Sequence, residues 1–336
     1  MSGGGVSFAL LCYNQQEFVA EAVAAALTQD CEPIEILISD DASTDGTWEA
    51  IQRATAGYRG PHRLRLHRNA RNLGCTGHTL AALAMAESDL VVVGAGDDVS
   101  EPDRVRAVMQ AASQEPQATS FWSDMRLIDE AGRDMGVIPG YFRPQATIPE
   151  MTDVGAAPVG ASQAYRKIVG EGFAAPDRRA GSEDLVLHYR SALLGGVKRV
   201  PGALVRWRRH VGSMESASPL MTSLDAQRFR DSVLRICEQR IFCFRARLDD
   251  LAGLAARQPE RRAELDDLAR RTRRLVRRFE AMQAMQAKAV GGGISAALRA
   301  LLNGARPGET ARNYLAIRHT ALWQRYTRWR AAQRRE

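Results

Sequence analysis

The sequence predicts an α/β protein, in which a mainly parallel β-sheet lies between helices and is followed by an all-helical region. Two observations lead to this fold class. Over the first 125 residues, short apolar segments without strict alternation take turns with amphipathic segments, as in parallel sheets covered on both faces. After about residue 220, the apolar residues follow helical spacing alone. We therefore expect two domains, residues 1–220 and 221–336.

Five short apolar segments are expected to form strands of the first domain: Val6–Leu11, Ile34–Asp40, Leu64–His67, Asp89–Gly94 and Thr119–Ser123. Helices are expected between them, because apolar residues such as Phe18, Ala22 and Ala26 recur at helical spacing. A hairpin, a Pro- and Gly-rich loop, a helix and two strands follow at Met125–Val137, Tyr141–Pro158, Ser182–Leu194, Val197–Val200 and Ala203–Arg209. Ligands of such sheets bind beyond the carboxyl ends of the strands, so candidate site residues are expected there.

The second domain is expected to be an antiparallel helical hairpin or a short coiled coil. Its apolar residues alternate steps of three and four, which is the spacing of one helix face packed on another. They are Leu234, Cys237, Ile241, Phe244, Leu248 and Leu251, and then Leu265, Leu268, Leu275, Phe279 and Met282. A terminal amphipathic helix is expected over Glu309–Arg335, and the helical region offers a surface for a homodimer.

The composition excludes several protein classes. With 45% hydrophobic residues in a chain of 336, the protein can bury a core and is neither disordered nor collagen-like. Five cysteines without a CxxC pair are expected to be reduced and buried. The start lacks the features of a secretory signal, and no apolar run approaches the roughly 18 residues of a spanning helix. We therefore expect a cytoplasmic protein.

The net charge of +7 indicates a partner with negative charge. The Arg-rich segment Ala256–Glu280 lacks a known nucleic-acid-binding module, so no specific nucleic acid is expected, and solvated helix faces explain this segment equally well. In the last segment, Arg318–Glu336, arginines alternate with Trp323 and Trp329, which suits an anionic membrane surface. The expected location is therefore the cytoplasm, with peripheral contact to the inner face of the plasma membrane.

Carboxylates gather after two of the expected strands. Asp40 and Asp41 end the second strand, and Ser43 and Asp45 follow. We expect Asp45 or Ser43 to cap the next helix, and either Asp40 or Asp41 to bind a ligand. Asp97 and Asp98 follow the fourth strand. Adjacent carboxylates there suit a hard divalent cation, Mg²⁺ or Mn²⁺, that is shared with substrate phosphates. A helix start explains acidic residues at this point as well.

Two further polar groups lie later in the chain. Glu183 and Asp184 enter an expected helix, where acidic residues are equally common for structural reasons. His210 follows the last expected strand, directly after Arg208 and Arg209. A lone histidine after a strand is more often structural, but a neutral imidazole binds divalent cations well and arginines neutralise phosphates.

Taken in order, these motifs resemble the family 2 glycosyltransferases, nucleotide-sugar enzymes of the GT-A fold. The resemblance covers about residues 6–218 and rests on Tyr13-Asn14, Asp40-Asp41-Ala42-Ser43, Asp45-Gly46-Thr47, Asn72 with Gly74, Gly96-Asp97-Asp98, Gly181-Ser182-Glu183-Asp184-Leu185, Arg190 with Gly195, and Arg208 with His210. The sequence departs from the family at Cys12, where a small hydroxyl residue is usual, and at Gly96, which replaces an acid. His78-Thr79 stand where Arg-Asn is common.

The resemblance implies which residues bind the nucleotide. They lie at the ends of the first four strands: Cys12, Tyr13, Asn14, Asp41, Arg71 and Asp97. Asp41 would meet the uracil or an equivalent base, and Asp97 would reach the ribose or the sugar. Arg71 or Arg68 would supply the positive charge that His78-Thr79 do not provide.

The resemblance also implies a metal site and a general base. Asp98 would bind Mg²⁺ or Mn²⁺ together with Asp97, and His210 would complete that site. Asp184 matches the base that activates the acceptor hydroxyl, with Glu183 beside it as a helper or a substitute. A single displacement assisted by one base inverts the configuration at the anomeric carbon.

The predicted function is therefore inverting, metal-dependent transfer of a sugar from a nucleoside-diphosphate sugar, UDP-sugars being favoured. The acceptor would be a glycan or lipid-linked hydroxyl in bacterial surface polysaccharide or glycoconjugate assembly. A nucleotidyltransferase is disfavoured because no Gly-rich, Arg-containing loop follows the first strand, and a dehydrogenase because no GxGxxG follows a strand. The alternative is a non-catalytic nucleotide-sugar-binding scaffold that uses its helical tail for assembly.

Overall fold

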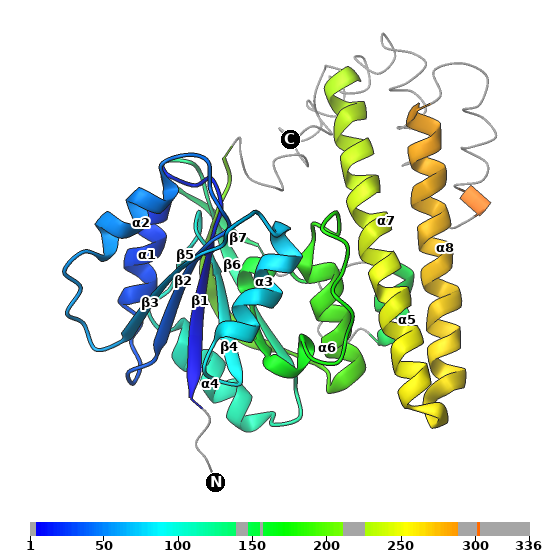
Figure 1. The fold of residues 1–336 in the computed structure, drawn as a ribbon, viewed down its shortest axis with the longest axis horizontal. Helices are drawn as coiled ribbons and strands as arrows, with labels where there is room; N and C mark the ends of the chain where they lie inside the picture. The colour runs from blue at the N-terminus through cyan, green and yellow to red at the C-terminus, as the bar shows by residue number, and fades with distance from the viewer. Residues whose placement is uncertain (1–4, 139–146, 155–156, 211–225, 288–300, 303–336) are drawn as a thin grey trace. The chain divides into compact units, whose positions relative to one another are not determined.

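The computed structural model describes residues 5–138, 147–154, 157–210, 226–287 and 301–302 (Figure 1). The chain divides into two compact units, residues 1–209 and 210–336. The domain boundary predicted at residue 220, like the predicted terminal helix Glu309–Arg335, lies outside the described residues.

The first unit is built on one sheet. Its strands are β1 (Val6–Cys12), β2 (Glu35–Asp40), β3 (Arg63–Arg68), β4 (Leu90–Ala95), β5 (Val99–Ser100), β6 (Ser120–Ile128), β7 (Asp134–Ile138), β8 (Gln163–Arg166) and β9 (Val197–Arg208). They lie in the order β3-β2-β1-β4-β8-β6-β9-β5, and β7 pairs with β6. The first four strands are parallel. Since β8 is antiparallel to both β4 and β6, and β9 is parallel to β6, β9 ends at the same edge as β1–β4.

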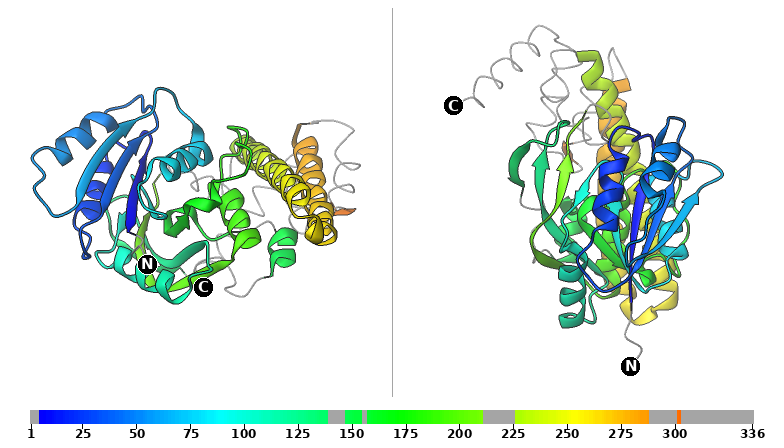
Figure 2. Two further views of the ribbon diagram at one scale, coloured as in Figure 1. Left: turned by 60° about the horizontal axis from the view of Figure 1, so that its bottom comes forward. Right: turned by 90° about the vertical axis from the view of Figure 1, so that its left-hand side faces the viewer.

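Helices cover both faces of this sheet. They are α1 (Val19–Leu27), α2 (Thr47–Thr55), α3 (Gly74–Met85), α4 (Arg104–Gln114), α5 (Ile148–Val154) and α6 (Tyr189–Leu194). Phe8 and Leu10 of β1 belong to one buried cluster with residues of α1, α2 and α4. On the opposite face α3 packs, and its His78 forms a hydrogen bond of 2.7 Å with Ser39 of β2. Figure 2 shows α1 and α3 on opposite sides of β1. The predicted sheet between helices is thus confirmed, with antiparallel strands added beyond β4.

Two local predictions need correction. The segment Tyr141–Pro158, predicted as a loop, contains α5, which begins with Thr147 and Glu150 bonded to each other's backbone N–H groups, a capping box. The two strands predicted at Val197–Val200 and Ala203–Arg209 are the single strand β9. Its register with β6 shifts near Gly202, which has a φ of +99°. The predicted hairpin over Met125–Val137 is confirmed by β6 and β7.

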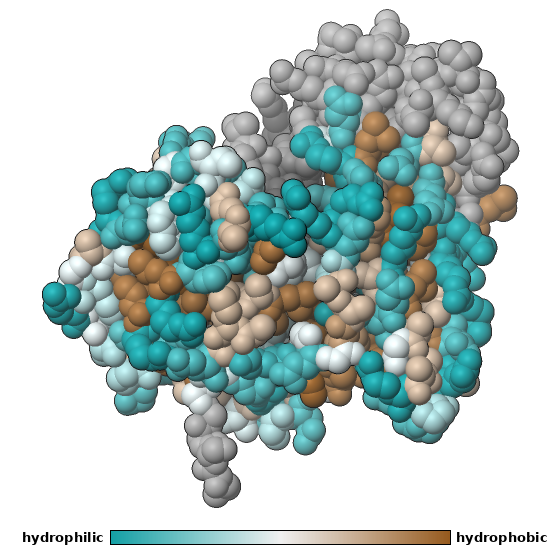
Figure 3. All heavy atoms as spheres, viewed as in Figure 1, coloured by the Kyte–Doolittle hydropathy of each residue, from teal (hydrophilic) through white to brown (hydrophobic). Residues whose placement is uncertain are grey.

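The second unit is a pair of long helices, α7 (Ala226–Arg257) and α8 (Arg262–Ala287), joined by the short 3₁₀ helix Pro259–Arg261. Apolar residues from the predicted periodic positions form its core, including Cys237, Ile241 and Phe244 of α7. In Figure 3, hydrophobic residues run between the two helices, with hydrophilic residues outside. The predicted helical hairpin is confirmed. Among the described helices, none has both the length and the apolar composition needed to cross a membrane.

Candidate active site at the carboxyl edge of the sheet

The loop after β2 is held by its own carboxylates. Asp40 is fully buried, accepts hydrogen bonds from the backbone N–H and the hydroxyl of Ser43, and forms an ion pair with Arg68 at the end of β3. Ala42, which lies between Asp40 and Ser43 in the chain, has a φ of +57°, a conformation that residues with a side chain rarely adopt. Such a strained backbone needs strong local bonds, and Asp40 supplies them. Asp40 is therefore used to shape this loop.

Asp41 caps helix α3. Its carboxylate accepts hydrogen bonds from the backbone N–H of Leu73 at 2.9 and 3.0 Å, the N–H of Gly74 at 3.0 Å and the side-chain amide of Asn69 at 2.8 Å. Only 2% of Asp41 is exposed. These N–H groups have no partner within the helix, and a negative charge at a helix N-terminus is favourable. The structure thus fixes the turn that starts α3 to the end of β2.

The loop after β1 joins this arrangement. Asn14, with a φ of +52°, donates its backbone N–H to the Ser43 hydroxyl at 2.9 Å and accepts from the N–H of Thr44 at 2.9 Å. Cys12 is buried, and burial followed by the charges of Asp40 and Asp97 raises the pKa of its thiol well above the usual value. Tyr13 is 44% exposed, so its ring is available to a ligand at this edge. Of the three residues predicted from this loop, Tyr13 and Asn14 are exposed and Cys12 is buried.

Asp98 occupies an electrostatically unfavourable position after β4. It is 5% exposed, and its Oδ1 accepts a hydrogen bond of 2.9 Å from the backbone N–H of Arg208. Burial, and then the charge of Asp97, raise the pKa of Asp98 well above the usual value, although Arg208 and Arg104 oppose this. Among the described residues, no donor reaches Oδ2. A cation at that oxygen would offset the cost of the buried charge.

The glycine that departs from the family pattern has a packing reason. A Cβ at Gly96 would lie 2.9 Å from the sulfur of Cys12 and 2.5 Å from Oε1 of Gln15. Real side chains do not approach so closely. The buried Cys12 therefore leaves no room for a side chain at position 96, where the family has an acid.

Arg208 locks the end of β9 to the loop that carries Asp97 and Asp98. Its Nε donates to the carbonyl of Asp97 at 3.0 Å, and its Nη1 donates to the carbonyl of Glu130 at 3.1 Å. It also forms an ion pair with Glu21 and lies over the ring of Phe18, and its side chain is 3% exposed. This guanidinium therefore positions the site and is not free to neutralise a phosphate. Arg71 is exposed and, within the described residues, has no ion-pair partner, so it is better placed for that role.

Glu183 and Asp184 stand at the start of a π-helix, Asp184–His188, which continues into α6. Glu183 is 9% exposed and accepts a hydrogen bond of 2.8 Å from the thiol of Cys75 on α3. Burial raises the pKa of Glu183, against the opposing effect of Cys75 and of nearby backbone N–H groups. Asp184 is only partly buried. Of the two acids, Asp184 is the more exposed.

The first turn of α3 connects these parts of the site. Its N–H groups hold Asp41, Cys75 holds Glu183, and the hydroxyl of Thr76 donates to the carbonyl of Ala180, just before the acidic pair. On the other side, the sheet places the end of β1 between the ends of β2 and β4. The predicted residues Cys12, Asp41, Asp98 and Glu183 therefore belong to one network of strand ends and the α3 turn.

The metal site predicted at Asp97, Asp98 and His210 stays a prediction. In the described part of the chain, no group of three or more His, Cys, Asp or Glu side chains is arranged to hold a metal ion. Asp97 and Asp98 are adjacent at the sheet edge, while His210 is the first residue of the second unit. Its role as a metal ligand stays a prediction.

Two residues that contact or lie close to the predicted acids were not predicted from the sequence. Cys75 was expected only to be a buried small residue, and nothing in its neighbours signals a contact with Glu183. Arg104 is 1% exposed, and its guanidinium donates to the carbonyl of Val93 at 2.7 Å, to the carbonyl of Ala161 at 2.9 Å and to the hydroxyl of Ser100 at 2.9 Å. Burial lowers the pKa of Arg104 to about 10. A signal for Arg104 existed, because an arginine among the apolar positions of an amphipathic helix faces the core.

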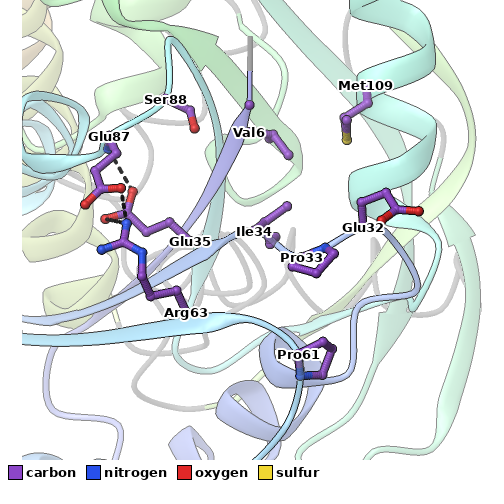
Figure 4. A pocket seen from close by; sticks show the side chains of 11 residues that line it. Val6, Glu32, Pro33, Ile34, Glu35, Pro61, Arg63, Glu87, Ser88 and Met109 are labelled. Atoms are coloured by element: carbon purple, nitrogen blue, oxygen red, sulfur yellow. Dashed lines mark hydrogen bonds and ion pairs between the residues drawn. The ribbon is translucent and has the colours of Figure 1, made fainter. Parts of the chain in front are cut away.

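A cavity of about 520 Å³ lies at the opposite edge of the sheet. It is lined by residues at or near the amino ends of the strands, such as Val6, Glu35 and Arg63 (Figure 4). Arg63 forms ion pairs with Glu35 and Glu87 across it. The cavity is separate from the carboxyl edge, where the strand-end carboxylates lie.

Comparisons with known proteins agree with this geometry. The chain is 24% identical over 217 residues to the uncharacterized protein Rv1520 of Mycobacterium tuberculosis, which covers 61% of this chain and 59% of that protein. The chain thus spans less than two thirds of that relative.

Two solved structures resemble the fold. One is TarS 1–349 of S. aureus in complex with UDP-GlcNAc, with a TM-score of 0.54 and 16% identity over 97% of this chain and 92% of that one. The other is the mannosyltransferase PcManGT of Pyrobaculum calidifontis in complex with GDP-Man and Mn²⁺, with a TM-score of 0.51 and 17% identity over 96% and 87% of the two chains. The fold is the GT-A-like α/β fold that the sequence predicts. Residues 7–146 match the family model described as "Glycosyl transferase family 2", so this segment of the chain is similar to that family.

Proposed function

We propose that the protein transfers a sugar from a nucleoside-diphosphate sugar to a hydroxyl group of an acceptor, with inversion at the anomeric carbon. The observation that carries the proposal is the arrangement at the carboxyl edge of the sheet. There, Oδ2 of the buried Asp98 has no donor among the described residues, and the more exposed Asp184 stands on the helix whose start is bonded to α3. One carboxylate suits a cation and the other suits a base.

Asp97 and Asp98 fit a hard divalent cation. The charge of Asp97 adds to the cost of the buried charge of Asp98, and Oδ2 of Asp98 lacks a donor among the described residues. Two protein ligands fit Mg²⁺ or Mn²⁺, because such ions retain waters and bind substrate phosphates. PcManGT was solved with Mn²⁺. A bound cation would stabilise the negative charge that develops on the diphosphate leaving group.

The protein's own residues would supply positioning and proton transfer. Tyr13 and Asn14 border the space beyond β1 and would contact the nucleotide, while Arg71 would neutralise a phosphate. Asp41 fixes the loop that shapes this space. Asp184 would accept the proton of the acceptor hydroxyl as that oxygen attacks the anomeric carbon, which makes a poor nucleophile reactive.

The donor and the acceptor are proposed at the level of chemical class. UDP-sugars are favoured as donors, and TarS was solved with UDP-GlcNAc, whereas PcManGT was solved with GDP-Man. The acceptor would be a glycan or lipid-linked hydroxyl of a bacterial surface polysaccharide or glycoconjugate. The protein would then work in the cytoplasm, at the inner face of the plasma membrane, with its Arg-rich helices towards anionic lipid. A homodimer through the helical region is part of the same proposal.

An Asp184→Asn variant tests the proposal. We expect it to bind UDP or GDP with Mn²⁺ like the wild type, and to release nucleotide from UDP-GlcNAc or GDP-Man at least about a hundredfold more slowly, since general bases contribute about 10²- to 10⁴-fold. The control is Asp177→Asn, which removes an exposed carboxylate that is paired with Arg179 in the same unit. Wild-type turnover in Asp184→Asn would exclude Asp184 as the base. Nucleotide binding without turnover in the wild type would favour the scaffold.

A further inference from the structure

The contact between Cys75 and Glu183 joins two elements that the proposed reaction needs. Cys75 lies in the first turn of α3, and its thiol donates to Oε2 of Glu183 at 2.8 Å. The residue before it, Gly74, donates its N–H to Asp41 at 3.0 Å. The residue after it, Thr76, donates to the carbonyl of Ala180. Three successive residues thus bind the end of β2 on one side and the segment before Asp184 on the other.

Glu183 is confined by this contact. The other oxygen of Glu183, Oε1, lies 1.5 Å from the position that a Cβ at residue 160 would occupy. Any side chain at position 160 would clash with this carboxylate, so only a glycine fits there. Nearby backbone N–H groups, including that of Asp184, also bond to the carboxylate. The Glu183 side chain is therefore held between Cys75 and Gly160. Its position fixes the start of the π-helix.

The thiol is suited to act as a permanent donor. Burial and then the charge of Glu183 raise the pKa of Cys75 well above the usual value. The group therefore stays protonated at neutral pH and keeps its hydrogen for Glu183. A thiolate would repel the carboxylate instead.

We propose that Cys75 is a positioning residue for the transfer reaction: its thiol holds Glu183 and thereby sets where Asp184 presents its carboxylate to the acceptor. This inference rests on the proposed function and assigns Glu183 a structural part, as the anchor of the base-bearing helix, in place of a second base. Because the same turn of α3 holds Asp41, the positions of the nucleotide loop and of the base depend on each other.

Three variants of the full chain test this. Cys75→Ala removes the donor, Cys75→Ser keeps a donor at the same position, and Cys31→Ala is the control, a partly buried cysteine of the same unit. Nucleotide release is measured with UDP-GlcNAc and with GDP-Man in the presence of Mn²⁺. Loss of a donor to a buried carboxylate predicts a kcat about tenfold lower in Cys75→Ala, with the donor KM changed less than about twofold. Cys75→Ser recovers most of the kcat, and Cys31→Ala resembles the wild type.

The pH profile of kcat separates positioning from general loss of stability. The groups that face Glu183 are Asp184 on its own helix, Cys75 from α3, and the buried Tyr165 of β8, whose own pKa is raised by burial and by these acids. Without the thiol donor, the charged form of Glu183 is disfavoured and its pKa rises further. Because the charged Glu183 is what holds the helix that carries Asp184, the acid limb of kcat moves to higher pH in Cys75→Ala. In Cys75→Ser, the acid limb is expected to return to its wild-type position.

A spectroscopic measurement tests the contact independently of turnover. The Raman S–H stretching band of Cys75, assigned by difference from Cys75→Ala, is expected to shift in Glu183→Gln, because a neutral amide is a weaker acceptor. An unshifted band overturns the inference, as does Cys75→Ala with wild-type kcat and pH profile in an active enzyme. If the wild type turns over none of a broad panel of nucleotide sugars, the proposed function fails, whatever the band shows.

Discussion

Replacing Asp41 by alanine distinguishes a structural carboxylate from one that reads the nucleotide base. The resemblance to family 2 implies contact with the base, whereas the structure shows the carboxylate bonded to Asn69, Leu73 and Gly74 at 2.8 to 3.0 Å. If these bonds hold α3 in place, Asp41→Ala must destabilise the first unit even when no nucleotide is present.

The size of the effect follows from the contacts. The substitution leaves three donors without their acceptor, and all three are only partly buried, so water replaces some of the loss. At about 1 kcal/mol for each donor, the free energy of unfolding falls by about 3 kcal/mol. For a unit of this size, that corresponds to a decrease in Tm of about 6 to 12 °C.

The assay is thermal and urea unfolding of the full chain without nucleotide, followed by fluorescence. The matched control is Glu49→Ala, which removes an exposed carboxylate from the first turn of α2 and is expected to cost less than about 1 kcal/mol. If Asp41→Ala were no less stable than Glu49→Ala but had lost its affinity for UDP, the capping role would be refuted and the base contact favoured.

Three further predictions concern packing and charge. Gly96→Ala forces a Cβ to 2.9 Å from the sulfur of Cys12 and should lower stability by about 1 to 2 kcal/mol in urea unfolding, with recovery in the double variant that also carries Cys12→Ala. For Glu35, burial is outweighed by donors that lower its pKa, so its stabilising contribution exists above the unfolded pKa and is lost as the pH falls through the folded pKa. Glu35→Gln should therefore be less stable than the wild type at pH 7, and equal stability there would contradict this; the difference should shrink in acid. Phe244→Ala should destabilise the helical hairpin by about 3 to 5 kcal/mol in thermal circular dichroism, while Leu302→Ala, at an 83% exposed position, should not.

Much of the fold was predictable because its signals are local. Each of the first four strands is a short apolar segment flanked by helical spacing, and the apolar rhythm of α7 and α8 identifies the second unit. The strands that were missed, β5 and β8, have two and four residues and are formed by pairing with distant strands. Helix α5 was missed although the sequence Thr147-Ile148-Pro149-Glu150 is a capping signal, because the Pro and Gly around it favoured a loop.

The residues of the candidate site could be predicted from the sequence. Which of them have structural roles could not. Acids at strand ends are visible in the sequence, and the sheet topology brings them to one edge. Whether an acid has a structural role depends on backbone N–H groups far along the chain. Asp41, for example, is bonded to N–H groups at the start of α3. Arg208 was expected at the phosphates, yet it pairs with Glu21, 187 positions away. Only the folded chain shows such partners.

The central claim is that Asp98 binds a divalent cation which in turn binds the diphosphate of the donor. Its most direct test is isothermal titration calorimetry of UDP and GDP, with and without Mn²⁺, on the wild type and on Asp98→Asn. We predict that Mn²⁺ tightens the binding of at least one nucleotide to the wild type by about tenfold or more, and that Asp98→Asn loses this gain while remaining folded. If Mn²⁺ strengthened nucleotide binding equally in both proteins, or had no effect on the wild type, the claim would be contradicted.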